Sequence, residues 1–322
     1  MDVYPYRLEP IYLEKIWGGR SLERLFGRKL PAGKQIGESW ELADLPEGVS
    51  VVSNGPAAGI SLTDLTKQMG ADLLGGAPAM PDGRFPLLLK LLDANDILSL
   101  QVHPDAEAVE RIRAEGEDAA LKTECWYVVE SRDGMIHKGV QPGTTPEAFR
   151  AAAVADDVER HVRPVPVAAG DFHFLPAGTV HALGAGVVVA EAQTPSDTTY
   201  RVTDWGRGRE IHVDRSVQCI HFTPADDAAP GAAGETLLIT EFFTVARRAA
   251  RAGMPVHLPD GRCAAVMMLD AAGNAAVHHT GTVELVVPLR AGDTVLVPAA
   301  CNNPRIVAAA PCRWLEITLP EG

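Results

Sequence analysis

Short apolar runs, bounded by glycine, proline and polar turns, recur along most of this chain. Runs of four to eight such residues predict β-strands rather than helices. The most hydrophobic run is Phe85–Asp93, in which a single lysine interrupts a series of leucines. It predicts a strand that is buried on both faces. Lys90 on that strand then requires a charged partner or a polar cavity.

Two further strands carry polar side chains among apolar ones. Residues 97–103 predict a strand that Pro104 ends, and residues 121–130 predict another from their aromatic and β-branched content. Side chains alternate between the faces of a strand, so Gln101 and His103 leave the same face. Glu124 stands early in the second strand. In the preceding N-terminal region, Glu38 and Glu41 are interpreted as ordinary strand and turn carboxylates; the alternative, that one of them lines a site, is not decided by spacing alone.

The segment 170–181 reads Gly-Asp-Phe-His-Phe-Leu-Pro-Ala-Gly-Thr-Val-His. Its aromatic run, its Pro-Ala-Gly turn and the apolar residues that follow predict a β-hairpin. We expect this hairpin to hold His181 at the mouth of a β-barrel. Another strand follows at 187–192, and a polar turn at 194–199.

Helices are few. The Ser-x-x-Asp start of one segment, and the proline in the first turn of another, are typical helix beginnings. Four segments predict helices: 61–74, about 105–115, 145 to about 162, and 211–220. The Pro/Ala/Gly-rich stretch 224–234 predicts a linker.

Beyond the linker, short strands at regular spacing predict a second β-domain. Gly292–Pro298 repeats the frame of Gly170–Pro176, with proline six residues after glycine in both. The position that corresponds to His181 is occupied by Asn303. We therefore predict a catalytic domain at 1–234, with helical segments, and a smaller barrel at 235–322 without metal ligands.

Composition fits a soluble globular protein, with 46% apolar and 22% charged residues in 322. The formal net charge of −13 argues against nucleic acid as a partner. It leaves an anionic small substrate open, because the charge of a pocket can oppose that of the chain. No apolar run reaches the roughly 18 residues of a membrane span. The first residues lack the features of a signal peptide, so we expect a cytoplasmic protein without a membrane partner.

The five cysteines are odd in number and scattered, with no C-x-x-C spacing. This pattern argues against a disulfide framework or a thiolate zinc site. The cysteines are interpreted as buried or incidental thiols.

The polar residues of the predicted strands form a candidate metal site. Gln101, His103, Glu124 and His181 offer an amide oxygen, two imidazoles and a carboxylate, a set that suits zinc first. A single histidine of this kind is more often a core residue, and a single glutamate is more often solvated. The inward pairing on one strand and the histidine on the hairpin together favour a metal.

The stretch 191–205 is dense in polar groups between two strands. It is either a turn with local hydrogen bonds or part of the same site. In the second case Arg201 would stabilise an oxyanion, and Glu191 would move a proton.

Four blocks make the chain similar to a known family. It resembles the type I phosphomannose isomerases (mannose-6-phosphate isomerases), above all their short bacterial form. The blocks span about residues 85–205 in the order of that family: Leu88–Ala94, Leu98–Pro104, Lys122–Trp126 and Gly170–Arg201.

The resemblance implies a mainly β fold with some α: a cupin (a jelly-roll-like double-stranded β-helix) with a second, smaller cupin-like barrel. It implies one zinc ion per chain, held by the residues at positions 101, 103, 124 and 181. It also implies that Arg201 assists catalysis, that Lys122 and Glu191 line the pocket, and that Ser99 and Lys90 lie near the substrate or its phosphate.

The implied reaction interconverts mannose 6-phosphate and fructose 6-phosphate by moving a proton between C2 and C1 through a cis-enediolate. Glu191 and Lys122 are both candidates for the base. Lys90, Lys122 or Arg201, together with Ser99, would anchor the phosphate.

Two alternatives are another metal-dependent cupin enzyme and a non-catalytic sugar-phosphate-binding cupin. The blocks around Lys122 and Arg201 favour the isomerase over the first, and the intact ligand set favours it over the second. Monomer and homodimer, the metal used in vivo and the role of the second barrel all stay open.

Overall fold

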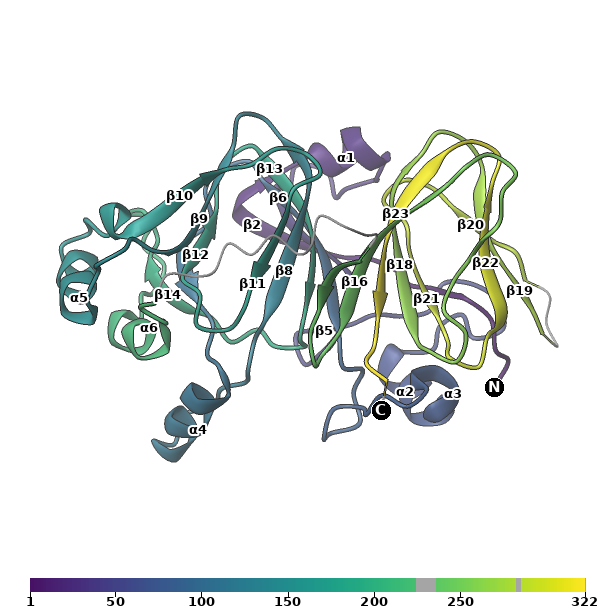
Figure 1. Ribbon diagram of the computed structural model, residues 1–322, viewed down its shortest axis with the longest axis horizontal. Coiled ribbons are helices and arrows are strands. Elements are labelled where there is room, and N and C mark those ends of the chain that lie inside the picture. Colours follow the sequence, from purple (N-terminus) through teal and green to yellow (C-terminus); the bar gives the residue numbers. More distant parts are fainter. Residues whose placement is uncertain (224–235, 282–284, 322) are drawn as a thin grey trace.

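The computed structural model describes residues 1–223, 236–281 and 285–321. The predicted linker at 224–234 lies outside these residues. Two barrels stand side by side, each formed by a pair of facing antiparallel sheets (Figure 1). None of the described helices is long and apolar enough to span a membrane.

The N-terminal barrel pairs a six-stranded sheet with a five-stranded one. The larger sheet has the order β11 (Phe172–Leu175), β8 (Glu124–Ser131), β13 (Val187–Gln193), β6 (Leu88–Ala94), β3 (Ile36–Leu42) and β2 (Ile11–Gly19). The smaller has the order β10 (Val162–Pro166), β9 (Met135–Val140), β12 (His181–Leu183), β7 (Leu100–Val102) and β14 (Tyr200–Thr203). A short pair, β4 (Asp44–Leu45) and β5 (Gly48–Val49), stands apart.

The C-terminal barrel repeats this plan with fewer strands. Its larger sheet has the order β1 (Tyr6–Arg7), β21 (Thr294–Val297), β18 (Ala264–Ala271), β23 (Cys312–Thr318), β16 (Thr244–Ala250) and β15 (Thr236–Ile239). Its smaller sheet has the order β17 (Val256–His257), β22 (Asn302–Ala308), β19 (Ala275–Thr280) and β20 (Val287–Leu289). The N-terminal strand β1 thus belongs to this barrel, and the division of the chain at residue 234 stays a prediction.

Each barrel has an apolar interior, and a third apolar cluster joins the two. The joining cluster draws on Leu89 and Leu91 from β6 and on Leu315 and Ile317 from β23. Every residue of β6 is buried, which confirms the prediction of a strand covered on both faces. Burial on both sides explains why this strand reads as a continuous apolar run.

Short helices cover the outside: α1 (Ser21–Phe26), α2 (Leu62–Met69), α3 (Ala71–Leu74), α4 (Ala106–Ala114), α5 (Pro146–Val154), η1 (Glu159–His161) and α6 (Val213–Cys219). The helices predicted at 105–115 and 211–220 are confirmed. The one predicted at 61–74 is capped by Ser61 and is broken at Gly70, whose φ is +51°. The helix predicted from 145 to 162 is wrong beyond Val154. Asp156 there has a φ of +54°, which ends the helix, and β10 follows.

The hairpin predicted at 170–181 is also wrong, although both of its strands exist. β11 pairs with β8 in the larger sheet, whereas β12 pairs with β7 and β9 in the smaller one. The turn between them therefore carries the chain from one sheet across to the other. β21 and β22, at the predicted internal repeat, cross between the two sheets of the second barrel in the same way.

Candidate metal centre and active-site pocket

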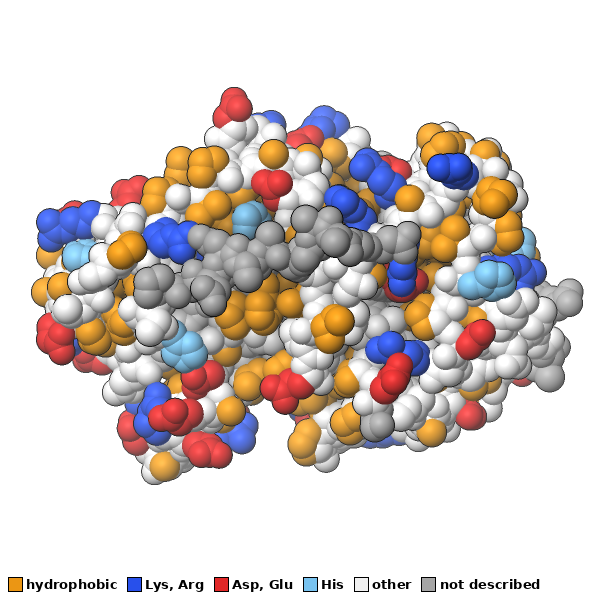
Figure 2. All heavy atoms as spheres, in the orientation of Figure 1, with side chains coloured by type: hydrophobic (Ala, Val, Ile, Leu, Met, Phe, Trp, Pro, Cys, Tyr) orange, Lys and Arg blue, Asp and Glu red, His pale blue; other side chains and the backbone are white. Residues whose placement is uncertain are grey.

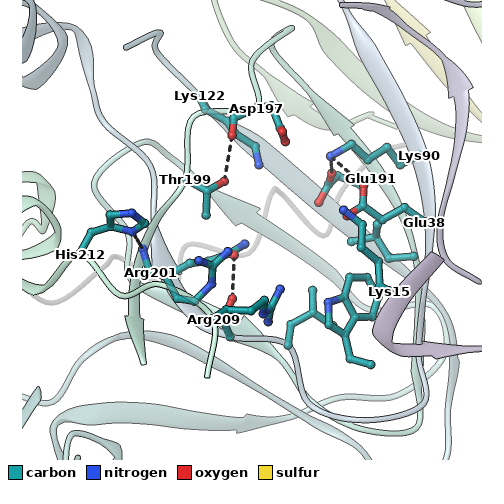
Figure 3. A pocket seen from close by; sticks show the side chains of 15 residues that line it. Lys15, Glu38, Lys90, Lys122, Glu191, Asp197, Thr199, Arg201, Arg209 and His212 are labelled. Atoms are coloured by element: carbon teal, nitrogen blue, oxygen red, sulfur yellow. Dashed lines mark hydrogen bonds and ion pairs between the residues drawn. The ribbon is translucent and has the colours of Figure 1, made fainter. Parts of the chain in front are cut away.

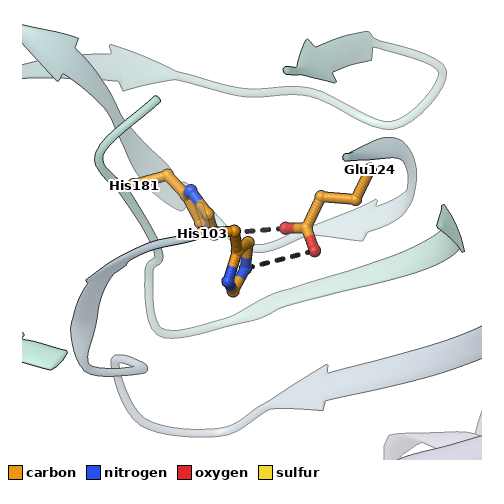
Figure 4. Close-up of side chains that lie close together, drawn as sticks. All are labelled: His103, Glu124 and His181. Atoms are coloured by element: carbon orange, nitrogen blue, oxygen red, sulfur yellow. Dashed lines mark ion pairs between the residues drawn. The ribbon is translucent and has the colours of Figure 1, made fainter. Parts of the chain in front are cut away.

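Three predicted ligands meet inside the N-terminal barrel. His103 directly follows β7, Glu124 begins β8 and His181 begins β12, and all three are buried (Figure 4). The Nε2 atom of His181 lies 3.1 Å from Oε1 of Glu124, and Nε2 of His103 lies 3.4 Å from Oε2. One donor atom from each residue fits within 4.8 Å of the others. Three separate strands therefore aim their side chains at one point.

The backbone sets the tautomer of both imidazoles. The Nδ1 atom of His103 lies 2.9 Å from the carbonyl oxygen of Thr198, and that of His181 lies 2.8 Å from the carbonyl oxygen of Thr179. A carbonyl oxygen only accepts, so each Nδ1 must carry the hydrogen. In the neutral rings, Nε2 then presents a lone pair to the carboxylate of Glu124. This is the outer support that metal-binding histidines need.

Gln101 borders the cluster from β7. It lies opposite His181 in the strand register, and its Nε2 is 3.4 Å from Nε2 of His181. Its Oε1 accepts a hydrogen bond from the Ser99 hydroxyl at 3.4 Å. A half-turn of the amide exchanges its oxygen and nitrogen and would direct the oxygen at the cluster.

A pocket of about 240 Å³ opens beside these residues. Its lining includes all five residues predicted for catalysis or substrate binding: Lys90, Ser99, Lys122, Glu191 and Arg201. It also includes Lys15, Glu38, Asp197, Arg209 and His212, which the sequence reasoning had not placed there (Figure 3). Five lysines and arginines face three carboxylates in this lining. On the face of the molecule that Figure 2 shows, acidic and basic side chains are interspersed.

Comparisons with known proteins agree with this arrangement. A family model described as phosphomannose isomerase type I, catalytic domain, matches residues 6–125. Mannose-6-phosphate isomerase of Streptococcus mutans is 39% identical over 255 residues, which cover 74% of this chain and 78% of the relative. The chain belongs to the type I phosphomannose isomerase family. The probable mannose-6-phosphate isomerase GmuF of Bacillus subtilis is 38% identical over 67% of this chain and 68% of its own length.

Solved structures of this family share the fold. Mannose 6-phosphate isomerase from Bacillus subtilis superposes with a TM-score of 0.84 at 29% identity, covering 97% of this chain and 99% of that one. The apo form from Salmonella typhimurium superposes with a TM-score of 0.77 at 18% identity, covering 98% and 99%. The predicted mainly β cupin fold is confirmed.

Charge around the centre is tightly paired. Burial works against ionisation of Glu124, yet Lys122, His103 and His181 hold the pKa of this carboxyl well below its usual value. Burial lowers the pKa of His103 to about 3, with Lys122 adding to the effect. The imidazole of His103 is therefore neutral near pH 7. Its Nε2 and both oxygens of Glu124 are buried and make no hydrogen bond to the described residues, and the charged neighbour of the carboxylate is Lys122, 3.2 Å from Oε2.

Glu191 is held from two sides. Trp126 donates its indole N–H to Oε2 at 2.7 Å, and the ammonium of Lys90 lies 3.2 Å from Oε1. Burial raises the pKa of Glu191, and the charge of Glu124 raises it further. Lys90 also lies 3.8 Å from Glu38, which pairs with Lys15 at 2.8 Å. Glu191 and Glu38 are therefore the charged partners that Lys90, a buried lysine on β6, was predicted to require.

The remaining predicted residues lie around the same space. The ammonium of Lys122 is 3.2 Å from Oε2 of Glu124, at the boundary between pocket and cluster. Arg201 on β14 lies opposite Gln101 and donates from Nη1 to the carbonyl oxygen of Glu210 at 2.7 Å. In Figure 3, Arg201 and Arg209 lie across the pocket from Lys90, Glu191 and Glu38.

The missed residues had a weak signal in the sequence. Glu38 shares a face of its strand with Trp40, and the spacing alone did not decide whether it lines a site. Lys15 stands on a strand of mixed polarity. Only the pairing of β2 with β3, and of β3 with β6, brings both into the pocket.

Proposed function

We propose that the chain interconverts mannose 6-phosphate and fructose 6-phosphate as a metal-dependent isomerase. The observation that carries the proposal is the meeting of three acceptor groups, two imidazole Nε2 atoms and a carboxylate, beside a cationic pocket. Acceptors repel one another unless a cation lies between them, so the cluster fits a metal ion. The pocket fits a phosphorylated sugar, because its excess of cations matches a dianion.

His103, Glu124 and His181 would hold the metal, with Gln101 as the fourth ligand and zinc as the first choice. When bound, such an ion acts as a Lewis acid that polarises a carbonyl oxygen and stabilises negative charge on it. Lys122 lies 3.2 Å from Oε2 of Glu124 and so borders this set of residues.

We assign the transfer of the carbon-bound proton to Glu191. Starting from the aldose, its carboxylate takes the proton from C2, and the electron pair left behind forms the enediolate. The proton then returns to C1, while a second proton moves from the oxygen on C2 to the oxygen on C1. Two features support Glu191 as the base: its orientation by Trp126 and Lys90, and a pKa raised by burial.

Lys122 is the second candidate for the base, and its place next to the ligand cluster suits the oxygen-bound proton better. Arg201 faces Glu191 across the pocket and stays cationic, so it can stabilise the enediolate oxygens. The charge of Lys90 is already shared between Glu191 and Glu38. We therefore assign the phosphate to the side of Ser99, Arg201 and Arg209, and give Lys90 the role of holding Glu191.

A coupled assay tests the proposal. Metal-replete protein is given mannose 6-phosphate, and fructose 6-phosphate is followed before and after complete metal removal. We expect turnover that is lost on removal and returns with added zinc. No turnover by the zinc-loaded protein would refute the isomerase, and turnover unchanged in the metal-free protein would refute the metal.

A further inference from the structure

The C-terminal barrel has a cavity of its own, of about 450 Å³. Its lining includes Arg248, Arg262 and Glu316 together with several threonines. Trp314, two residues before Glu316 on β23, packs into the interior core of this barrel. Residues two apart share a face of a strand, so Glu316 points inward as well. The cavity therefore lies on the inner face of the larger sheet.

Glu316 is the counterpart of Glu191 in the repeated plan. The strand pairs β8–β13 and β18–β23 have the same register. Each glutamate lies opposite the third residue of its partner strand, Trp126 in one barrel and Val266 in the other. Both carboxylates are buried, each 3% exposed, which is costly without a compensating charge.

A compensating cation, Arg248, is also present, but it stands at another position of its strand than Lys90 does in the first barrel. The counterpart of Lys90, opposite Glu316, is Ala246. Two residues further along β16, Arg248 donates from Nε and Nη2 to Oε1 of Glu316 at 3.2 and 3.1 Å. The second barrel thus keeps a buried carboxylate with a cation at the place where the first barrel has Glu191 and Lys90.

The metal ligands are lost. Ala264 stands at the position of Glu124, since Val297 pairs with it as Leu175 pairs with Glu124. Asn303 stands at the position of His181 in the repeat. The second cavity therefore has the means to bind a ligand but lacks the groups that would hold a catalytic ion.

A second arginine, Arg262, lines the cavity, whose two arginines face two glutamates. Arg262 donates from Nη2 to the carbonyl oxygen of Leu319 at 2.7 Å and to the hydroxyl of Thr318 at 3.2 Å. Its Nε is buried and has no hydrogen-bond partner among the described residues. The exposed Glu321 lies 3.4 Å from Nη1. Guanidinium groups bind phosphate through paired N–H donors, and a buried carboxylate accepts hydrogen bonds from hydroxyls.

We propose that this cavity binds a hexose phosphate without converting it. Arg262 would hold the phosphate, and Glu316, paired with Arg248, would hold the sugar together with the threonine hydroxyls. The volume lies within the range of small-molecule pockets, about 300–1,000 Å³. The site is separate from the active-site pocket and does not depend on catalysis there.

Titration calorimetry with glucose 6-phosphate tests the site in a background that weakens the first pocket, Lys122→Ala with Arg201→Ala. We expect saturable binding that becomes about tenfold weaker when Arg262→Ala is added, because a charge-assisted hydrogen bond is lost. The Arg248–Glu316 pair stays intact in that variant. Arg247→Ala is the matched control, since Arg247 is the preceding residue of β16 and is exposed on the other face.

Binding that is unaffected by Arg262→Ala, or equally weakened by Arg247→Ala, would overturn the proposal. Glu316→Gln should weaken the binding of glucose 6-phosphate and leave the binding of inorganic phosphate unchanged. Inorganic phosphate binding as tightly as glucose 6-phosphate would overturn recognition of the sugar. Because no turnover is measured, these outcomes are independent of whether the first barrel is an isomerase.

Discussion

The two barrels of this chain share a frame and differ in their chemistry. Corresponding strands pair in the same order and register, from β11–β8–β13–β6 in one to β21–β18–β23–β16 in the other. At the metal centre, however, alanine and asparagine replace glutamate and histidine. The apolar alternation builds the frame, and a handful of inward positions decide whether it carries a site.

A second difference lies at the edge of the smaller sheets. In the first barrel, β14 pairs with β7 and carries Arg201. In the second, the described part of the chain places no strand beyond β17, the short counterpart of β7. The first barrel thus has an extra edge strand that brings an arginine to its pocket.

The largest effect is expected when Glu124 of the metal centre is replaced by alanine, the residue that stands at this position in the second barrel. Glu124→Ala should remove bound zinc and lower kcat by more than about 10²-fold, since even outer-shell partners of a metal are worth 10–100-fold. Metal content by mass spectrometry and the coupled assay measure both. The control is Asn303→Asp, at the position of the second barrel that corresponds to His181, and it should change neither the zinc content nor kcat. Full zinc content in Glu124→Ala would contradict the assigned ligand set.

Removing the arginine of the extra strand should be the next largest change. Arg201→Ala should keep its zinc and lose kcat by about 10²-fold, the usual cost of one group that stabilises a developing oxyanion. Arg313→Ala, an exposed arginine of the second barrel, serves as the control. If Arg201→Ala instead lost its zinc while kcat per bound zinc stayed normal, Arg201 would support the metal site and would not stabilise the oxyanion.

A smaller effect is expected at Trp126. The ring centroids of Trp126 and His181 lie 5.4 Å apart. Trp126→Phe keeps an aromatic ring at this place but removes the indole N–H that donates to Glu191. We expect kcat to fall by about tenfold with KM little changed, because one hydrogen bond to a charged group is lost. That hydrogen bond lowers the pKa of Glu191. Its loss raises the pKa, so the acid limb of the kcat/KM profile should move to higher pH.

The matched control is Trp314→Phe in the interior of the second barrel. The indole nitrogen of Trp314 has no hydrogen-bond partner among the described residues. This substitution should leave the rate and its pH profile unchanged. A profile of Trp126→Phe that does not move would argue that Glu191 is not the base.

Much of the fold could be predicted because the signals are local. The apolar run of β6 and the polar positions 101 and 103 follow from side-chain alternation alone. The end of α5 could not be predicted, since Asp156 adopts a left-handed conformation that side chains other than glycine rarely take. The predicted metal ligands lie together, while the roles of the ligands and of the pocket residues stay proposals.

The sequence by itself determined the strands, the blocks that carry the family and the face on which Gln101 and His103 lie. Only the tertiary structure decided that the segments 172–175 and 181–183 belong to opposite sheets, and that Lys15, Glu38 and Arg209 enter the pocket. The physical reason is the sequence separation over which each interaction acts. Alternation and turn residues act between neighbours in the chain, whereas strand pairing is set by burial of faces far apart in sequence. The correspondence of Glu316 with Glu191 likewise follows only from the pairing of β18 with β23 and of β8 with β13.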